Sequence, residues 1–192
     1  MSPRARPGKP RVRLFLALEL PEAVRGPLAA WRDEALAGIE ELRPVRADYL
    51  HVTLVFLGWQ YERDAGRIAA TAFESLAGLP PVALTPRGLT PVPKRAPRLL
   101  ALDLEDSGGT AAAVQDAPAR ALAAARLYEP EKRPFWPHVT LARVKRGRRP
   151  PSVPAGRPPV EPFEASVVTL YQSLLQPQGA RYEALHRHTL DR

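Results

Sequence analysis

Two copies of the tetrapeptide HVTL contain the residues best suited to chemistry in this sequence, and their histidines are His51 and His138. Each copy lies in an apolar run that favours a β-strand, in which alternate side chains share a face. His51 and Thr53 are therefore expected on one face, and His138 and Thr140 repeat the arrangement. If the valines and leucines pack into the core, two such strands side by side present two imidazoles and two hydroxyls to one small molecule.

This set of groups suits the hydrolysis of a cyclic phosphodiester. A neutral imidazole removes a proton and an imidazolium donates one near pH 7, so the pair can supply a general base and a general acid. Threonine hydroxyls can donate hydrogen bonds to the non-bridging phosphate oxygens and stabilise the charge of a pentacovalent transition state. Water attacks in line, the ring oxygen leaves with a proton, and no metal is needed. The residues alone do not assign acid and base to particular histidines.

Arg143 is a further candidate for phosphate binding, because its planar guanidinium suits phosphate oxygens. It follows His138 by five residues, an odd offset, so a regular strand would place it on the opposite face. A bulge or a strand end would be needed to return it to the groove. Otherwise it is a solvated arginine in a basic run with Lys145 and Arg146.

The elements that must position these residues follow from apolar periodicity. The first predicted helix, over 21–42, is interrupted by Gly26-Pro27, so its regular part is expected to begin there. Pro118 makes the start of the predicted helix over 110–127 doubtful. Helices spread among many strands indicate an α+β fold with largely antiparallel pairing. A helix precedes each HVTL strand, which predicts two similar lobes facing each other across a shared groove. We expect strands over 12–20, 49–57, 81–89, 98–104, 138–144, 163–171 and 182–190, and helices over 21–42, 63–76 and 110–127.

Composition limits the size, the partners and the cellular location that can be expected of this protein. The 192 residues suit one domain or two closely coupled lobes, and the net charge of +8 favours an anionic partner such as nucleic acid. Because cysteine is absent, disulfides, thiolate metal sites and thiol nucleophiles are excluded. No apolar run approaches the roughly 20 residues of a membrane span, and residues 1–10 read as a basic flexible tail rather than a secretory signal. We therefore expect a cytoplasmic protein without a membrane partner.

The two motifs and their surroundings resemble the RNA 2′,3′-cyclic phosphodiesterases, also described as 2′-5′ RNA ligases, of the 2H phosphoesterase superfamily. The resemblance extends from about Arg11 to about Leu190. It implies a single bilobal α+β domain over residues 11–192, with two mostly antiparallel sheets, outer helices, a central groove and a pseudo-twofold axis. The stretches that carry it are RLFLALELP at 13–21, LHVTLVFLG at 50–58, RPFWPHVTLARVK at 133–145 and LYQSLLQPQGARYEAL at 170–185.

The resemblance also implies an activity: metal-independent hydrolysis of a terminal 2′,3′-cyclic phosphate of RNA to a 2′-phosphomonoester. His51 would be the proton donor to the leaving O3′, and His138 the proton acceptor that activates water. Thr53 and Thr140 would hold the phosphate, and Arg143 matches the arginine that follows the second motif in the family. The implied partners are RNA 3′ ends or nucleotides with a cyclic phosphate, with no cofactor, no metal and no obligate protein partner.

Several alternatives stay open at this point. The same histidines would serve a 2′-5′ RNA ligase, the reverse reaction, and the scaffold could be a non-catalytic module that binds RNA ends. A metal site is disfavoured because the motifs supply only two nitrogens. Phe15 and Trp136 either stack on a nucleobase or pack in the core. Glu19 and Asp48 lie close in sequence to the motif strands, where either could orient a histidine.

Overall fold

A computed structural model describes residues 10–149, 158–176 and 179–191 of the chain. The basic tail expected over residues 1–10 lies outside these ranges except for Pro10, and so does most of the Pro/Arg-rich segment 147–159. In the described part of the chain, no helix is long and apolar enough to span a membrane.

The described chain forms nine strands, three α-helices and two short 3₁₀-helices. In chain order they are β1 (Arg11–Glu19), α1 (Glu22–Ala35), β2 (Leu42–Pro44), η1 (Ala47–Tyr49), β3 (His51–Tyr61), η2 (Glu62–Asp64), α2 (Ala65–Glu74), β4 (Val82–Val92), β5 (Leu99–Glu105), α3 (Thr110–Ala124), β6 (His138–Val144), β7 (Phe163–Ala165), β8 (Val167–Leu174) and β9 (Arg181–Thr189).

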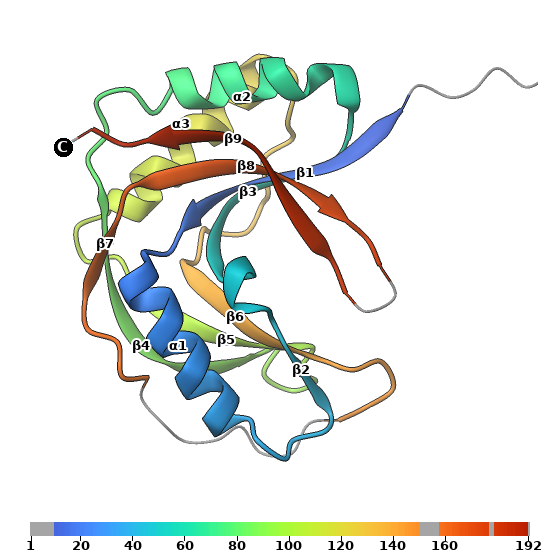
Figure 1. Ribbon diagram of the computed structural model, residues 1–192. Coiled ribbons are helices and arrows are strands. Elements are labelled where there is room, and N and C mark those ends of the chain that lie inside the picture. The colour runs from blue at the N-terminus through green and yellow to red at the C-terminus, as the bar shows by residue number, and fades with distance from the viewer. Residues whose placement is uncertain (1–9, 150–157, 177–178, 192) are drawn as a thin grey trace, which may run out of the picture.

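All strand pairs are antiparallel and follow one curled path in the order β7-β4-β5-β6-β3-β1-β8-β9, with β2 added on β6. The two HVTL strands, β3 and β6, pair only at Val52 and Val139. The sheet therefore consists of two halves that diverge from this junction (Figure 1). The α+β class is confirmed, and the two expected sheets are the two halves of this path.

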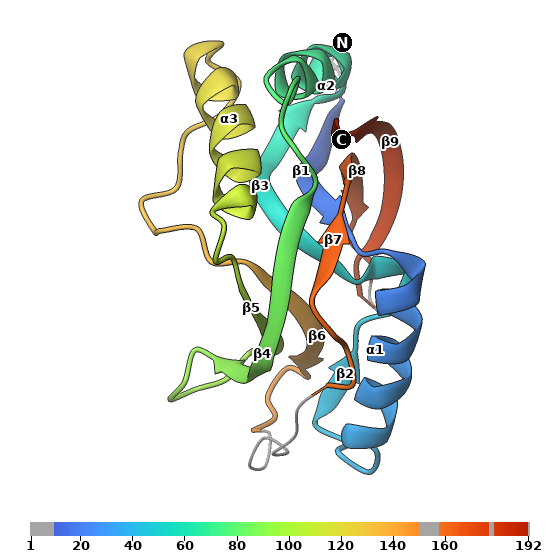
Figure 2. The same cartoon turned by 90° about the vertical axis from the view of Figure 1, so that its left-hand side faces the viewer.

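The helices lie outside the curled sheet. In Figure 2, α2 and α3 are neighbours at one end of the molecule, and α1 lies against the half that contains β6. Strand β1 is central between β3 and β8, which explains why residues 14–18 are apolar without alternation: both faces are buried. The largest fully buried side chains include Leu14, Leu16, Leu18, Leu28, Ile68, Leu102, Leu122, Leu141 and Leu170.

Two helix boundaries differ from the sequence expectation. The first helix ends at Ala35 instead of residue 42, because Gly38 adopts a left-handed conformation with φ of 78° that does not continue a helix. It also begins at Glu22, so Pro27 lies inside it rather than in its first turn, and Pro118 lies inside α3.

Two strands differ as well. The single strand expected over 163–171 is two strands, β7 on β4 and β8 on β1, so one segment joins both halves of the sheet. The three-residue β2 was not predicted, because its sequence Leu-Arg-Pro contains no alternation long enough to recognise. β2 pairs with the residues of β6 that immediately follow the second motif, so it places Arg43 opposite Arg143.

Candidate active site

Both motif strands contain a β-bulge at the same position. The register of β3 on β1 skips Leu54, and the register of β6 on β5 skips Leu141. One extra residue reverses the alternation of side chains beyond it. Arg143 therefore shares a face with Thr140 despite its odd offset from His138, and the structure contains the bulge that the sequence argument required. Phe56 occupies the corresponding place in β3.

The two histidines are held in the same way. Nδ1 of His51 lies 2.7 Å from the carbonyl oxygen of Tyr49, and Nδ1 of His138 lies 2.8 Å from that of Trp136. Because a carbonyl oxygen only accepts, each Nδ1 carries a proton, and Nε2 is left for chemistry. Nε2 of His51 lies 3.1 Å from the Thr53 hydroxyl. The backbone two residues before each histidine thus fixes its tautomer and orientation.

Burial dominates the protonation of both rings. It lowers the pKa of His51 to about 4, against the opposing hydrogen bond to Tyr49, and the charges of Arg143 and His138 lower the pKa further. Burial also lowers the pKa of His138, but here the hydrogen bond to Trp136 and the negative charge of Asp103 oppose the shift. Both imidazoles are accordingly neutral near pH 7 in the empty site.

Aromatic rings enclose His51. The centroid of the Phe15 ring is 5.1 Å from that of the His51 ring. The centroid of the Tyr182 ring is 5.5 Å from that of His51, and these two rings are nearly perpendicular, in a T-shaped arrangement. Phe15 is only 4% exposed and also packs on Tyr171 at 5.3 Å. Phe15 therefore packs in the core beside His51 and also lines the cavity, and its contact with the His51 ring excludes water from that ring.

A carboxylate supports His138 through Trp136. The Trp136 ring stacks on His138, with centroids 4.2 Å apart and planes 16° from parallel, and its Nε1 donates to Oδ1 of Asp103 at 2.6 Å. Asp103 also lies directly opposite His138 in the β5–β6 register. Trp136 thus stacks on the histidine in this structure. Asp103 was missed by the sequence analysis, although LALD at 100–103 repeats LALE at 16–19 and could have indicated it.

Glu19, the counterpart of Asp103, lies opposite His51 but is engaged elsewhere. Its Oε1 accepts hydrogen bonds from Thr169, Tyr171 and Arg187 at 2.6, 2.9 and 2.9 Å. Burial alone would raise the pKa of Glu19, but these hydrogen bonds and the charge of Arg187 lower it overall. Asp48 is exposed and pairs with Arg46. The side-chain contacts of Glu19 are thus with residues of β8 and β9, and that of Asp48 is with exposed Arg46, rather than with a motif histidine.

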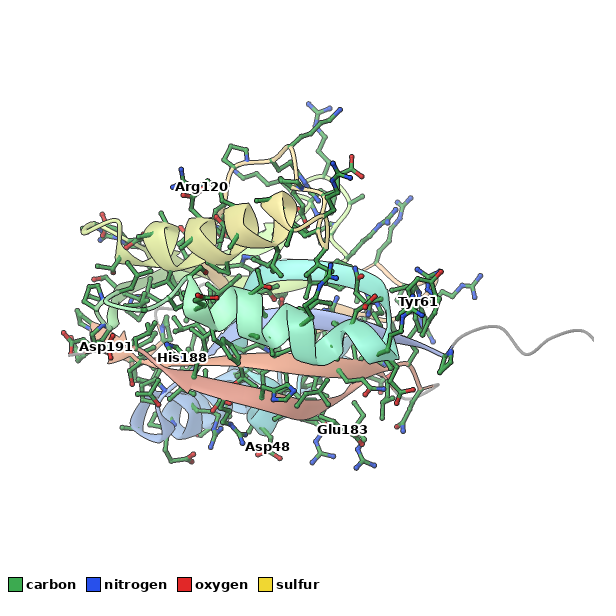
Figure 3. All side chains as sticks on the ribbon, turned by 90° about the horizontal axis from the view of Figure 1, so that it is seen from above. Asp48, Tyr61, Arg120, Glu183, His188 and Asp191 are labelled. Atoms are coloured by element: carbon green, nitrogen blue, oxygen red, sulfur yellow. The ribbon has the colours of Figure 1, made fainter. Side chains whose placement is uncertain are left out.

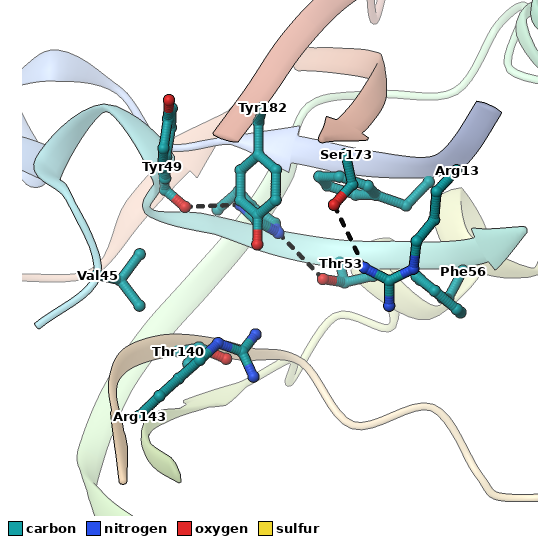
Figure 4. A pocket seen from close by; sticks show the side chains of 11 residues that line it. Arg13, Val45, Tyr49, Thr53, Phe56, Thr140, Arg143, Ser173 and Tyr182 are labelled. Atoms are coloured by element: carbon teal, nitrogen blue, oxygen red, sulfur yellow. Dashed lines mark hydrogen bonds between the residues drawn. The ribbon is translucent and has the colours of Figure 1, made fainter. Parts of the chain in front are cut away.

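The motif residues converge on one cavity of about 100 Å³ between the two halves of the sheet. His51 and Thr53 line it from β3, and Thr140 and Arg143 line it from β6 (Figure 4). His138 is not among the lining residues, but it lies on the same strand face as Thr140 and its charge affects the pKa of His51. One cavity therefore combines groups from both motifs.

Arg13 is a second guanidinium in this cavity that the sequence analysis did not identify. It reaches in from β1, donates to the Ser173 hydroxyl at 3.3 Å and lies 4.6 Å above the Phe56 ring (Figure 4). Arg143 approaches from the other half of the sheet. The guanidiniums of Arg13 and Arg143 and the hydroxyls of Thr53 and Thr140 around one small cavity match the donor requirements of a phosphate group.

Within residues 10–149, 158–176 and 179–191, no cluster of three or more histidine, cysteine, aspartate or glutamate side chains could hold a metal ion.

The curled antiparallel sheet with a His-x-Thr motif in each half defines the class of protein as a 2H phosphoesterase. The family model of the 2′-5′ RNA ligase superfamily matches residues 20–178, and the chain belongs to this superfamily.

Known relatives agree with this assignment. The chain is 32% identical to the RNA 2′,3′-cyclic phosphodiesterase of Aeropyrum pernix, over 84% of this chain and 93% of that protein. It is also 32% identical to the enzyme of the same name from Thermus thermophilus, over 93% and 90% of the two chains. Among solved structures, E. coli LigT complexed with 3′-AMP superimposes with a TM-score of 0.74 and 27% identity, covering 95% of this chain and all 100% of LigT.

Proposed function

We propose that this protein hydrolyses the terminal 2′,3′-cyclic phosphate of RNA to a 2′-phosphomonoester without a metal ion. The observation that supports this most directly is the cavity that joins His51, Thr53, Thr140 and Arg143 from two halves of one sheet. The names of the curated relatives supply the substrate class, since each is an RNA 2′,3′-cyclic phosphodiesterase.

In the proposed reaction, Nε2 of His138 removes a proton from water, and the water oxygen forms a bond to phosphorus. The bond between phosphorus and O3′ breaks in line with this attack, and His51 protonates the leaving oxygen. Negative charge develops on the non-bridging oxygens. Thr53, Thr140 and Arg143 stabilise it, since they donate from both sides of the cavity.

Substrate binding must favour protonation of His51 before this residue can act as the acid, because burial keeps its ring neutral in the free enzyme. A phosphate anion beside Nε2 favours the imidazolium and also offsets the positive charge of Arg143. The bound substrate therefore helps to create the acid that cleaves it. His138 needs no such change, because a neutral ring is the form that a general base requires.

The decisive experiment is incubation of the protein, in EDTA, with a short RNA that ends in a 2′,3′-cyclic phosphate. Products are separated by whether the phosphate remains on O2′ or O3′. A 2′-phosphate is expected, and His51→Ala or His138→Ala should each lower the rate by roughly 10²- to 10⁴-fold. His186→Ala is the matched control, since His186 is exposed on β9. Retention of the wild-type rate by either motif variant, or full inhibition by EDTA, would refute the mechanism.

Ligation is the second candidate, and membership of the 2′-5′ RNA ligase superfamily favours it. The same groups would act with the 5′-hydroxyl of a second RNA in place of water. Measuring hydrolysed and joined products from one mixture of RNAs distinguishes the two activities. Binding of the RNA end without any turnover would indicate a non-catalytic module instead. A cytoplasmic location and the absence of an obligate protein partner stay predictions from the sequence.

A further inference from the structure

A second cavity, of about 190 Å³, adjoins the candidate active site. The two cavities share four lining residues, Val45, Tyr49, Arg143 and Tyr182, so a common wall separates them. Three more arginines line only the second cavity, namely Arg43, Arg46 and Arg181. Among the residues that the structure describes, no acidic residue lines it. The second cavity is therefore a basic extension of the first.

Two of these arginines face each other at a cost in stability. Arg43 on β2 is paired directly with Arg143 on β6, and like charges at such positions repel. Neither arginine forms an ion pair within the described residues, and the sequence outside those residues contains no aspartate or glutamate. An anion bound between the two guanidiniums would replace this repulsion with two favourable contacts.

Arg43 also extends across to the other half of the sheet. Its guanidinium lies so close to Gly179 that a β-carbon added there would be 3.2 Å from Cζ. Gly179 adopts a φ of +125°, a conformation that favours glycine. Arg181 begins β9 two residues later, and it lines the cavity from the same side. Guanidiniums thus approach the second cavity from both halves of the sheet.

The remaining pairs leave these charges available. Arg46 lies 3.3 Å from Asp48 and Arg181 lies 3.2 Å from Glu183, and all four side chains are substantially exposed. Exposed ion pairs of this kind contribute little and exchange readily for a more highly charged partner.

We infer that the second cavity binds the phosphate on the 5′ side of the terminal nucleotide, while the cyclic phosphate occupies the first cavity. This inference rests on the proposed function. Consecutive phosphates of an RNA strand belong to adjacent nucleotides, and the two cavities are adjacent because they share the lining residues Tyr49, Arg143 and Tyr182. The preferred substrate is then an oligonucleotide end rather than a nucleoside 2′,3′-cyclic phosphate that lacks a 5′-phosphate.

Three substrates test this selectivity: a nucleoside 2′,3′-cyclic phosphate, the same compound with a 5′-phosphate, and a dinucleotide ending in the cyclic phosphate. The two substrates with a 5′-side phosphate should have a kcat/KM higher by roughly 10- to 100-fold, the effect of one or two charge-assisted hydrogen bonds. Arg43→Gln and, independently, Arg181→Gln should bring this ratio down towards one. Arg120→Gln is the control, because Arg120 is exposed on the outer face of α3, away from the groove (Figure 3).

The outcomes distinguish phosphate binding in the second cavity from the proposed hydrolysis. A ratio near one in the wild type, or a ratio that Arg43→Gln and Arg181→Gln leave unchanged, overturns the second cavity as a phosphate site while hydrolysis stands. No turnover of any of the three substrates overturns the proposed function instead. In that case calorimetric binding of the dinucleotide to wild type and Arg43→Gln still decides the inference, since equal affinities would contradict it. Thermal unfolding shows whether each variant is folded.

Discussion

The charge states of the motif histidines lead to a pH dependence that can be worked out from the structure. With a pKa of about 4, His51 is protonated in roughly one free molecule in a thousand at pH 7. The pKa of His138 is also lowered, but Asp103 opposes the shift. The proposed reaction requires His51 charged and His138 neutral, which is a rare form of the free enzyme.

The value of kcat/KM follows the fraction of free enzyme in that form. The fraction is constant between the two pKa values and falls tenfold per pH unit below about 4 and above the lowered pKa of His138. We therefore expect kcat/KM to be highest on the acid side of neutrality. Burial lowers the pKa of His138 and with it the upper edge of this range, whereas the hydrogen bond to Trp136 and the charge of Asp103 shift that edge to higher pH.

Bound substrate raises the pKa of His51, so the pH dependence of kcat should differ from that of kcat/KM. Raising the pKa of His51 from about 4 to 7 requires about 4 kcal/mol. A phosphate anion about 4 Å from the imidazolium supplies about 4 kcal/mol at an effective dielectric constant near 20. The two values match, so the profile of kcat should extend to neutral pH while that of kcat/KM does not.

The assay is steady-state hydrolysis of a dinucleotide 2′,3′-cyclic phosphate between pH 4 and 9 at constant ionic strength, with circular dichroism to confirm folding at each pH. His186→Ala serves as the control, because an exposed histidine should leave both profiles unchanged. A kcat/KM profile that has its acid limb near 6.5, the ordinary histidine value, and its maximum above pH 7 would refute the argument that burial controls these rings.

Three further predictions concern single residues. Arg143→Lys keeps the charge but loses the planar fork, so kcat/KM should fall roughly tenfold, and an unchanged value would show that charge alone matters. Asp103→Asn keeps an acceptor for Trp136 but removes the charge that raises the pKa of His138, so the alkaline limb of kcat/KM should move to lower pH with little change in KM. Glu19→Ala leaves buried Thr169 without its acceptor and should lower the free energy of unfolding at pH 7 by about 1–3 kcal/mol. Because the folded-state pKa of Glu19 is lowered, urea titrations should show this difference fully above pH 4.5 and shrinking as the pH falls through the lower folded value.

Much of the candidate site could be predicted because the chemistry is concentrated in short repeats. The alternation within HVTL was enough to place His51 with Thr53 and His138 with Thr140, since a strand has a fixed side-chain period. For Arg143 the sequence showed only that a bulge or a strand end was needed to bring it to the groove. Whether a strand bulges at Leu141 depends on its register with β5, and that register is a tertiary property.

Other residues depended on contacts that no local pattern contains. Asp103 acts through Trp136, 33 residues later, so its role follows only from the pairing of β5 with β6. Arg13 shares a face with Phe15 through the regular alternation of β1, but its place beside the motif groups follows only from the pairing of β1 with β3 and β8. Helix α1 was predicted too long because apolar spacing continues past its end, whereas the left-handed Gly38 stops the helix.

The two halves of the site are similar but not identical, and this difference has a stereochemical consequence. A site with exact twofold symmetry would accept a cyclic phosphate in either of two orientations, so that O2′ and O3′ would leave equally often. Here Arg143 on β6 corresponds to Phe56 on β3, and Asp103 supports one histidine while Glu19 is bound to β8 and β9. These unequal partners make the two orientations unequal in energy. A duplicated motif can thereby yield a single regioisomer.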